Sequence, residues 1–595
     1  MAIQAHLPGG GFLLGASDSQ AVYAPEDFTD EHHLLAHTIR EFITQEVLPR
    51  TVAIEAKEEG VMPELLKKAG DIGLLSVEVP EKFGGAGMGL TCGMLLMETA
   101  GLGGGSFLTS IADHIGIGTL PIVYSGSDEL RQRYLPQLAT GEKLGCYCLT
   151  EPQSGSDALA AQTSAELSAD GTHYLLNGAK HYITNAAFSD LFTVFAKVDK
   201  TLFTAFVVER DAGGLTIGKE EHKMGIVGSS TCPVYLENTP VPVENVLGEV
   251  GAGHRVAFNI LNVGRLKLAA GCLGGMKSAI AAAVPYAKER HQFDRPIASF
   301  GLIQQKIADM AIRTYVLESL IYRTAGLIEA RLSALDETAD AYDAQVIKSI
   351  EEYAVECSIA KVAGSEMLDF VVDEMVQIYG GLGFIEESPA PRAYRDARIN
   401  RIFEGTNEIN RLLIPDTLMR RAMRGQLPLM DAVQQVTQNL LAPLSPLIDR
   451  DDDPLHVERQ LIERCKQGAL LCAGVAVQHY QQELAEQQEV LGMIADMAIE
   501  IYGAESALLR TLKCLSSEAG DPDGFRLDVT RAWCRALPEK IERLGASTLA
   551  AAVEGDALTT PLAALKKLTR VTPVNTVAMQ RRVAAIMIDA ERYPL

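Results

Sequence analysis

Apolar residues recur at helical spacing over most of this 595-residue chain, and one stretch in its first half breaks the pattern. Between Leu35 and Val47 they return every three or four positions, which predicts an amphipathic helix. Thr29 is placed to cap this helix and Pro49 to end it. Similar patterns continue to about residue 143, so the first part of the chain is expected to be helical.

Two glycine-rich stretches, residues 80–90 and 100–106, interrupt this first part. Neither has the spacing of a phosphate-binding loop, and neither follows a clear strand pattern. Both are therefore predicted to connect helices rather than to bind a nucleotide.

Near residue 146 the pattern changes to short alternating or β-branched runs separated by turn residues, which predicts a β domain of about a hundred residues. Asn177 and Gly178 stand between two such runs and predict a tight hairpin turn. Helical spacing returns near residue 251 and holds to about residue 423, in runs long enough for a bundle. A polar linker at 442–455 precedes a last helical block.

These changes predict a mainly α chain with one β domain, an α+β multidomain fold. Four domains are expected: an N-terminal helical domain at 1–145, a central β domain at 146–255, a helical bundle at 256–424 and an additional helical domain at 425–595.

The bulk chemistry argues against several partners. A formal charge of −24 repels nucleic acid and anionic lipid, so no nucleic-acid partner is expected. No apolar run approaches the length of a membrane span, and the start has no basic segment before its apolar residues, so the cytoplasm is expected. The ten cysteines form no CxxC pair and the twelve histidines no HExxH motif, which predicts reduced core thiols and no metal site.

Glu404 stands in an unusual position within "RIFEGTNEINRLL", residues 401–413, between Phe403 and Gly405 and ahead of a helical pattern. One reading is an acid near a helix start, where negative charge favours the helix dipole. The other is a general base in a dry pocket: Ile402 and Phe403 would exclude water, and Gly405 would let a ligand approach.

Further stretches suggest a site for a flat cofactor with a diphosphate. "YCLTEPQSGSD" at 147–157 and "YITNA" at 182–186 place polar and aromatic residues at strand ends, where they can face a ring system. Arg290, in "ERHQFDRPIASFGLIQ", can supply charge to a diphosphate, and the glycines of "QIYGGLGF" at 377–384 can let the backbone approach it. Taken singly, the glycines are typical of a helix C-cap and Arg290 of a surface charge.

In their order and spacing, these stretches resemble the signatures of the acyl-CoA dehydrogenase family over about residues 25–420. The resemblance implies a helical domain, a β-barrel-like domain and a four-helix bundle. The tail beyond 420, "ILNVGRLKLAAG" at 260–271 and "AWCRALPEKI" at 532–541 resemble the very-long-chain subgroup with its extra C-terminal helical domain.

The resemblance makes Glu404 the base that removes the α-proton of an acyl-CoA thioester. It implies an FAD site formed by Tyr147, Leu149, Thr150, Ser156, Tyr182, Thr184, Arg290, Phe293, Phe300, Gln377, Gly380, Gly381, Thr406 and Glu408. Of these, the residues from Arg290 to Gly381 would reach a cofactor bound mainly by the neighbouring subunit. Ser156, Asn262, Arg265, Phe403 and Gly405 would line the substrate channel.

Two positions vary within the family. Tyr182 stands where the family often has tryptophan, which keeps an aromatic face for the flavin but changes its hydrogen bonding. Some relatives carry the base directly before the channel arginine, and that position here is Gly264, which favours Glu404 as the base.

The implied activity is FAD-dependent α,β-dehydrogenation of long-chain fatty acyl-CoA to trans-2-enoyl-CoA in β-oxidation, with electrons passed to an electron-transfer flavoprotein. A homodimer is implied as well. An acyl-CoA oxidase that uses oxygen stays an alternative, as does a non-catalytic assembly factor or DNA-binding relative, although Glu404 and the charge of −24 count against these last two. Residues 424–447 could touch a membrane or be an ordinary packed helix and linker.

Overall fold

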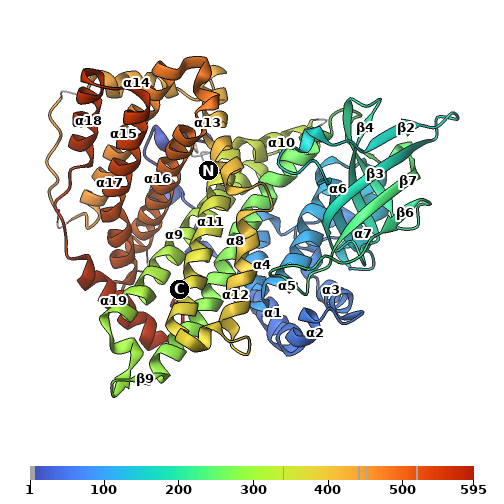
Figure 1. Cartoon of the computed structure of the whole chain (residues 1–595), viewed down its shortest axis with the longest axis horizontal. Coiled ribbons are helices and arrows are strands. Elements are labelled where there is room, and N and C mark those ends of the chain that lie inside the picture. Colours follow the sequence, from blue (N-terminus) through green and yellow to red (C-terminus); the bar gives the residue numbers. More distant parts are fainter. Residues whose placement is uncertain (1–6, 340, 440–441, 451, 518–519) are drawn as a thin grey trace.

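The computed structural model describes residues 7–339, 341–439, 442–450, 452–517 and 520–595. Its helical groups and its β-sheet lie in a row, with the sheet at one end, the long bundle helices in the middle and the extra helices at the other end (Figure 1). The prediction of a mainly α chain with a β domain is confirmed. The elements change type between Ala139 and Gly145 and again between Leu247 and Gly253.

The first helical group packs beside the sheet and against the bundle (Figure 1). Its helices are α1 (Asp30–Phe42), α2 (Thr51–Glu55), α3 (Val61–Asp71), α4 (Gly89–Ala100), α5 (Gly105–Asp113), α6 (Leu120–Ser125) and α7 (Asp128–Ala139). Both glycine-rich stretches connect helices, as predicted, since the first leads into α4 and the second joins α4 to α5.

Thr29 stands at the N-cap of α1, as predicted, but the prediction that Pro49 ends the helix was wrong. The chain stays helical through a π turn at Ile43–Val47 and a 3-10 turn at Leu48–Arg50, and then enters α2. Pro49 lies in the first turn of the 3-10 segment, where its missing N–H leaves no bond unmade.

The β domain is an eight-stranded sheet with its own apolar core, which includes Cys146, Phe192 and Phe206. The strand order is β6-β7-β3-β2-β4-β5-β8, with β1 paired in parallel to β4. The strands are β1 (Gly145–Cys148), β2 (Ser164–Leu167), β3 (His173–Thr184), β4 (Leu191–Val198), β5 (Leu202–Glu209), β6 (Leu215–Ile217), β7 (Thr231–Pro242) and β8 (Val246–Leu247).

The predicted hairpin turn at Asn177 and Gly178 was wrong, because both residues lie inside the uninterrupted strand β3. They form an irregularity in the pairing with β7, where the register shifts between Leu176 and Gly178. Gly178 has a φ of +156°, and a Cβ at this position would lie 2.5 Å from Thr163 Oγ1. Glycine is therefore required by the close approach of β2 and its preceding loop, not by a chain reversal.

The bundle comprises the long helices α8 (Gly253–Glu289), α9 (Gly301–Leu332), α11 (Ala354–Tyr379) and α13 (Asn407–Met423), with the shorter α10 (Tyr342–Glu352) and α12 (Pro389–Ala397). One continuous apolar core runs from the N-terminal helices through the bundle into the extra domain. All ten cysteines are free and buried, in agreement with the prediction of reduced core thiols.

Two described stretches, Gly105–Ser125 and α8, are long and apolar enough to cross a membrane by length and composition alone, contrary to the sequence expectation. Their most apolar windows are 78% and 67% buried within the molecule. Their hydropathy is thus accounted for by packing in the protein interior.

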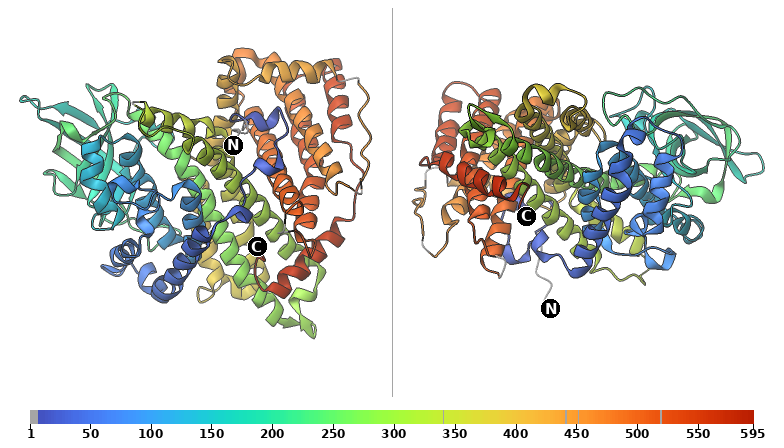
Figure 2. Two further views of the ribbon diagram at one scale, coloured as in Figure 1. Left: turned by 180° about the vertical axis from the view of Figure 1, so that it is seen from behind. Right: turned by 90° about the horizontal axis from the view of Figure 1, so that it is seen from below.

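The extra domain consists of α14 (Leu429–Gln438), α15 (His456–Tyr480), α16 (Gln488–Leu515), α17 (Phe525–Ala552), α18 (Asp556–Thr569) and α19 (Thr576–Ala590). The N-terminal segment runs between these helices and the bundle (Figure 2). It is held there by Lys466, whose Nζ donates to Gly15 O at 2.9 Å, and by Arg510, whose Nε donates to Glu26 Oε2 at 2.9 Å. The extra domain is therefore fastened to the rest of the chain by buried polar contacts as well as by apolar packing.

Candidate active site

Glu404 lies in the short loop between α12 and α13 with left-handed backbone geometry, at a φ of +58°. Gly405 follows with a φ of +81°. Asn410, one turn into α13, stabilises the loop: its Nδ2 donates to Gly405 O at 2.9 Å and to Thr406 O at 3.1 Å. Thr406 is the N-cap of α13 and accepts from Ile409 N at 3.3 Å. The capping role is thus filled by Thr406, and Glu404 is turned away from the helix start.

The Glu404 carboxylate rests directly on the backbone of α8. A Cβ at Gly264 would lie 2.7 Å from Glu404 Oε2, so a side chain there would displace the acid. Arg265 follows Gly264 and is buried; its Nε donates to Glu404 O at 3.3 Å and its Nη1 to Asn262 Oδ1 at 2.9 Å. The structure therefore brings Glu404 and Gly405 together with Asn262 and Arg265, all four as the resemblance implied.

Burial dominates the electrostatics of Glu404. Its Oε2 is enclosed and has no hydrogen-bond partner among the described residues. Burial raises the pKa of Glu404 to about 7, against the opposing charges of Arg265 and Lys361. A carboxylate with this pKa can accept a proton near neutral pH, as a general base must.

Three buried groups lie near Glu404, and two of them, Lys361 and Asp113, were not predicted from the sequence. Lys361, on α11, has a pKa lowered to about 8 by burial, and Glu404 acts against that shift. Burial raises the pKa of Asp113 and that of Tyr147, and the charge of Glu404 adds to both shifts. Tyr147 was predicted as a flavin contact but not as a neighbour of the base. Lys361 and Asp113 lie inside helical patterns, where the sequence gives no sign of an active-site role.

The two residues before Glu404 differ in how well they shield it from water. Phe403 packs against the main apolar core, whereas Ile402 is 48% exposed. The expectation that Ile402 excludes water was therefore wrong for this chain, because about half of its side chain faces the solvent.

The two strand-end motifs lie side by side. His181 N donates to Thr150 O at 2.8 Å, and Lys180 Nζ donates to Glu151 Oε1 at 2.7 Å within the interior. Tyr147 and Leu149 are buried, whereas Ser156 and Tyr182 are exposed; Tyr182 is 62% exposed with a φ of +57°. Thr184 ends β3 nearby. The Lys180–Glu151 pair, which the sequence reading missed although both residues lie beside the motifs, fixes this arrangement.

A second group of predicted residues lies at the far end of the bundle. Arg290 ends α8 and leads into a hairpin of β9 (His291–Gln292) and β10 (Arg295–Pro296), with Phe293 at its tip 87% exposed. The Tyr286 and Tyr379 rings stack at 4.2 Å and hold the end of α8 beside that of α11, where Gln377, Gly380 and Gly381 lie. Phe300 contacts Phe293 at 6.0 Å between ring centres.

This second group is remote from the sheet, since β9 lies at the lower end of the bundle and β3 at the opposite side of the molecule (Figure 1). One chain therefore does not bring all predicted cofactor residues together. Gly380, with a φ of +60°, and Gly381 have no atom within 4 Å of an added Cβ, so their surroundings are open. Thr406 and the exposed Glu408 stay with the base, at the start of α13.

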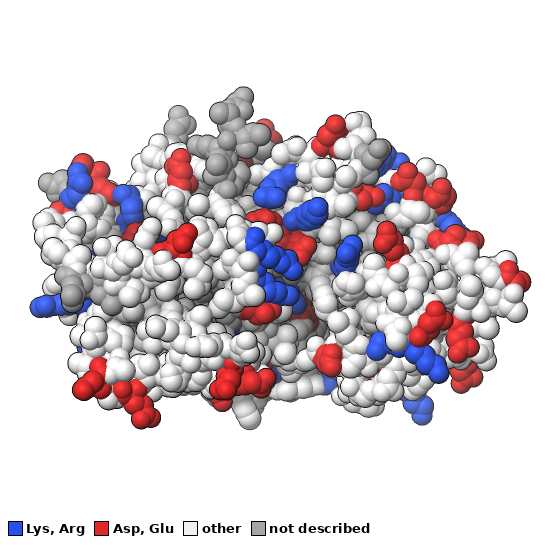
Figure 3. Space-filling model, turned by 90° about the horizontal axis from the view of Figure 1, so that it is seen from above, with Lys and Arg blue, Asp and Glu red and all other residues white. Residues whose placement is uncertain are grey.

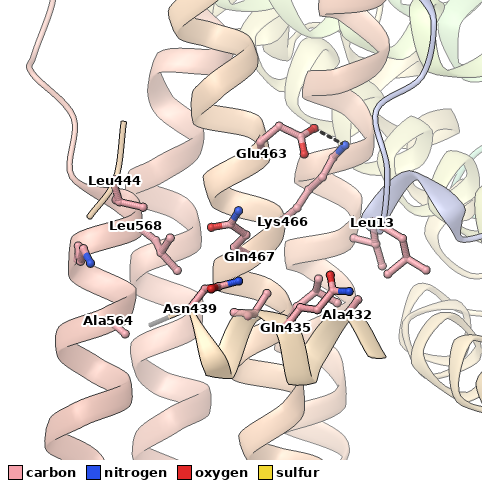
Figure 4. Close-up of a pocket in the computed structure, with 14 residues that line it drawn as sticks. Leu13, Ala432, Gln435, Asn439, Leu444, Glu463, Lys466, Gln467, Ala564 and Leu568 are labelled. Atoms are coloured by element: carbon pink, nitrogen blue, oxygen red, sulfur yellow. Dashed lines mark hydrogen bonds and ion pairs between the residues drawn. The ribbon is translucent and has the colours of Figure 1, made fainter. Parts of the chain in front are cut away.

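A cavity of about 200 Å³ lies elsewhere, within the extra domain and against the N-terminal segment (Figure 4). Its walls include Leu13, Gln435, Gln467 and Leu568, and none of the predicted site residues lines it. It is therefore separate from the candidate active site. Among the described residues, no group of three or more His, Cys, Asp or Glu could hold a metal ion.

The sequence matches four descriptions of one protein family along its length. "Acyl-CoA dehydrogenase, N-terminal domain" matches residues 29–142, the middle domain 146–239 and the C-terminal domain 251–419, and a second C-terminal domain description matches 464–567. The "Probable acyl-CoA dehydrogenase" of Bacillus subtilis (strain 168) is 47% identical over 98% of both chains. The chain belongs to the acyl-CoA dehydrogenase family.

Two further comparisons fit this assignment. The crystal structure of an acyl-CoA dehydrogenase complexed with FAD from Bacillus anthracis superposes with a TM-score of 0.97 at 46% identity, over 99% of this chain and 100% of that one. The very long-chain specific acyl-CoA dehydrogenase of Homo sapiens is 42% identical over 61% of this chain and 53% of its own length. This acyl-CoA dehydrogenase is accordingly an FAD-dependent oxidoreductase.

The residues present fit FAD. Tyr147 Oη is buried and has no hydrogen-bond partner among the described residues. Ser156 and Tyr182, in the same two strand-end motifs, are exposed. The open backbone at Gly380 and Gly381 offers the close approach that a diphosphate requires. These two features lie on opposite sides of the chain (Figure 1).

Replacement of Arg265 by Gln is expected to raise the pKa of Glu404 above about 7. The reason is that Arg265 is the larger of the two positive charges that lower this pKa against the effect of burial. Infrared spectroscopy of the apoprotein checks this: the carboxylic C=O band that Glu404→Gln abolishes should disappear at higher pH in Arg265→Gln than in the wild type. Arg255→Gln, also on α8 but not among the charges acting on Glu404, should leave the midpoint unchanged. Equal midpoints in all three proteins would contradict the assignment.

Proposed function

We propose that this acyl-CoA dehydrogenase oxidises long-chain fatty acyl-CoA thioesters to trans-2-enoyl-CoA, with Glu404 as the catalytic base. The observation that carries the proposal is the enclosed Glu404 Oε2, which has no hydrogen-bond partner among the described residues and lies against Gly264, with a pKa of about 7 for the acid. An ordinary helix-start acid would be solvated and would not need a glycine opposite its oxygen.

The chain's own residues prepare proton removal. The α-proton of a thioester is weakly acidic, so the base must be desolvated and positioned. Asn410 fixes the loop, and Arg265 and Lys361 keep the pKa of Glu404 from rising further. Gly405, beside Arg265, leaves space for the thioester. Bound FAD supplies the electron acceptor for the β-carbon.

The acidic excess of the chain is not spread evenly over its surface. Although the chain is strongly acidic overall, Lys and Arg side chains, with a few acidic ones among them, gather around a hollow between the extra domain and the β domain (Figure 3). A local excess of positive charge attracts phosphates even on an acidic protein.

The long-chain preference and the electron-transfer flavoprotein as acceptor rest on resemblance to the very-long-chain subgroup, and the cytoplasmic location rests on the sequence alone. An acyl-CoA oxidase is the alternative for the acceptor. An assembly factor or a DNA-binding relative has no need of a base with this pKa. In the 424–447 stretch, α14 packs against α15, which favours the ordinary helix, although residues 440–441 lie outside the described part.

We also propose a homodimer in which Arg290, Phe293, Phe300, Gln377, Gly380 and Gly381 complete the cofactor site of the neighbouring subunit. Phe293 at the hairpin tip and Phe384, in the 380–384 turn after α11, are both 87% exposed at this end of the bundle. This supports the dimer, because large apolar side chains exposed together are typical of a surface that another protein covers.

Initial rates with acyl-CoAs from butyryl to stearoyl and a dye acceptor are expected to peak at the long chains. Oxygen consumption with the same substrates should stay low, because a dehydrogenase passes its electrons to a protein acceptor. A peak at butyryl-CoA would contradict the chain-length proposal, and oxygen uptake at the dye-reduction rate would identify an oxidase.

Phe293→Asp is expected to dissociate the dimer and release FAD, because a charge at the hairpin tip would be buried on association. Light scattering with simultaneous flavin absorbance measures both effects. Val52→Asp is the matched control, since Val52 is 82% exposed on α2, away from the hairpin. A Phe293→Asp monomer that keeps its flavin would refute the shared site.

Glu404→Gln is expected to retain FAD while flavin bleaching by long-chain acyl-CoA slows by about 10²–10⁴-fold, the typical cost of losing a general base. Anaerobic stopped-flow absorbance measures the bleaching. Asp416→Asn removes a surface ion pair with Arg420 on the same helix α13 and should bleach at the wild-type rate. Bleaching of Glu404→Gln at the wild-type rate would place the base elsewhere.

A further inference from the structure

We infer that Asp496, on α16 of the extra domain, is a positioning residue for the base, acting through Arg411, Glu366 and Asn407. The inference rests on the proposed role of Glu404. It extends that proposal, because it gives the extra helical domain a part in the reaction.

The first step is Asn407, the residue that begins α13 directly after the base loop. It is 1% exposed, so its amide must find partners inside the protein. Lys361 Nζ donates to Asn407 Oδ1 at 2.7 Å, and Asn407 Nδ2 donates to Ser365 Oγ and to Glu366 Oε1, both at 3.0 Å. The start of α13 is therefore tied to α11 through a fully bonded amide.

The second step is the pairing of Glu366 with Arg411. Arg411 lies four residues after Asn407 on the same face of α13. Its Nη1 donates to Glu366 Oε1 at 2.8 Å and its Nη2 to Glu366 Oε2 at 2.9 Å. This bidentate geometry fixes the orientation of the Arg411 guanidinium and the Glu366 carboxylate. It therefore also fixes Glu366 Oε1, the oxygen that accepts from Asn407.

The third step crosses into the extra domain. Arg411 Nε donates to Asp496 Oδ1 at 2.7 Å, and α13 packs along α16. The guanidinium thus binds two carboxylates from two helices with all three of its nitrogens. Without Asp496, Arg411 would keep its two hydrogen bonds to Glu366 but would lose the contact that fixes its side chain along α13.

The domain boundary runs through this chain of contacts. Asn407, Glu366 and Arg411 fall in the part that matches the 251–419 description, whereas Asp496 falls in the 464–567 part. The extra domain therefore supplies one of the two carboxylates of a network that ends three residues from Glu404.

The test compares Asp496→Asn with Glu500→Gln in the full-length holoenzyme. Glu500 lies one turn further along α16 and pairs with Lys540 on α17 at 2.8 Å, away from α13, so its loss removes an ion pair of the same helix without touching the network. Asp496→Asn is expected to lower kcat by up to about 100-fold with little change in KM, because misplacing a reacting group by an ångström costs that much. Glu500→Gln should leave kcat unchanged.

Amide hydrogen exchange supplies a readout besides activity. Exchange at residues 404–410 should accelerate in Asp496→Asn and not in Glu500→Gln, and Asp496→Glu, which keeps the charge, should recover part of both effects. If Asp496→Asn and Glu500→Gln have the same kcat and the same exchange rates at residues 404–410, the inference is overturned. If Asp496→Asn does not fold, Asp496→Ala, which also removes the carboxylate, decides by the same two measurements, and wild-type values in that variant would overturn the inference.

Glu404→Gln, measured in parallel, separates this inference from the proposed function. If that variant bleaches normally, the base is elsewhere and the proposed function fails. If it is inactive while Asp496→Asn matches the wild type, only the positioning role is wrong.

Discussion

The contact between the Glu404 carboxylate and the backbone of α8 is the constraint on which the site depends. A Cβ at Gly264 would lie 2.7 Å from Glu404 Oε2, so the loop can reach this position only because α8 has no side chain there. The loop must also adopt left-handed backbone geometry at two successive residues, which is unfavourable for the non-glycine residue Glu404. The side chains of Thr406 and Asn410 offset this strain by bonding the loop to its own helix.

The same contact determines the proton affinity of the site. Enclosure raises the pKa of Glu404, and the nearby charges of Arg265 and Lys361 limit the rise to about 7. A carboxyl with a raised folded-state pKa stays protonated in the folded chain where the unfolded chain has already released the proton. Its burial therefore costs stability as pH rises from the ordinary value of 4.5 to about 7. The fold carries an acid in a place that destabilises it, which is typical of a catalytic position.

The molecule also separates the two groups of predicted cofactor residues. The strand-end motifs lie at the sheet and the hairpin and glycine loop at the opposite end of the bundle, each held by local contacts: the Lys180–Glu151 pair in one case and the Tyr286–Tyr379 stack in the other. Glu404 lies in the loop before α13 and is bonded to Arg265 of α8. Because α13 also packs along α16, the extra domain borders the helix that carries the base loop.

The sequence by itself determined the succession of helical and β segments, because a period of 3.6 or 2 is a local property of each stretch. It also supplied the family, through short motifs whose residues lie close together in the chain. Pro49 and Asn177–Gly178 show where local rules failed: a proline fits a 3-10 turn as well as a helix end, and an Asn-Gly pair fits an irregular strand as well as a turn. Only the tertiary structure decided that Gly264 faces Glu404, that Lys361 and Asp113 lie near the base, and that Arg411 binds Asp496 85 residues away. These contacts join segments distant in the chain, and the pattern along one segment carries no information about which other segment packs against it.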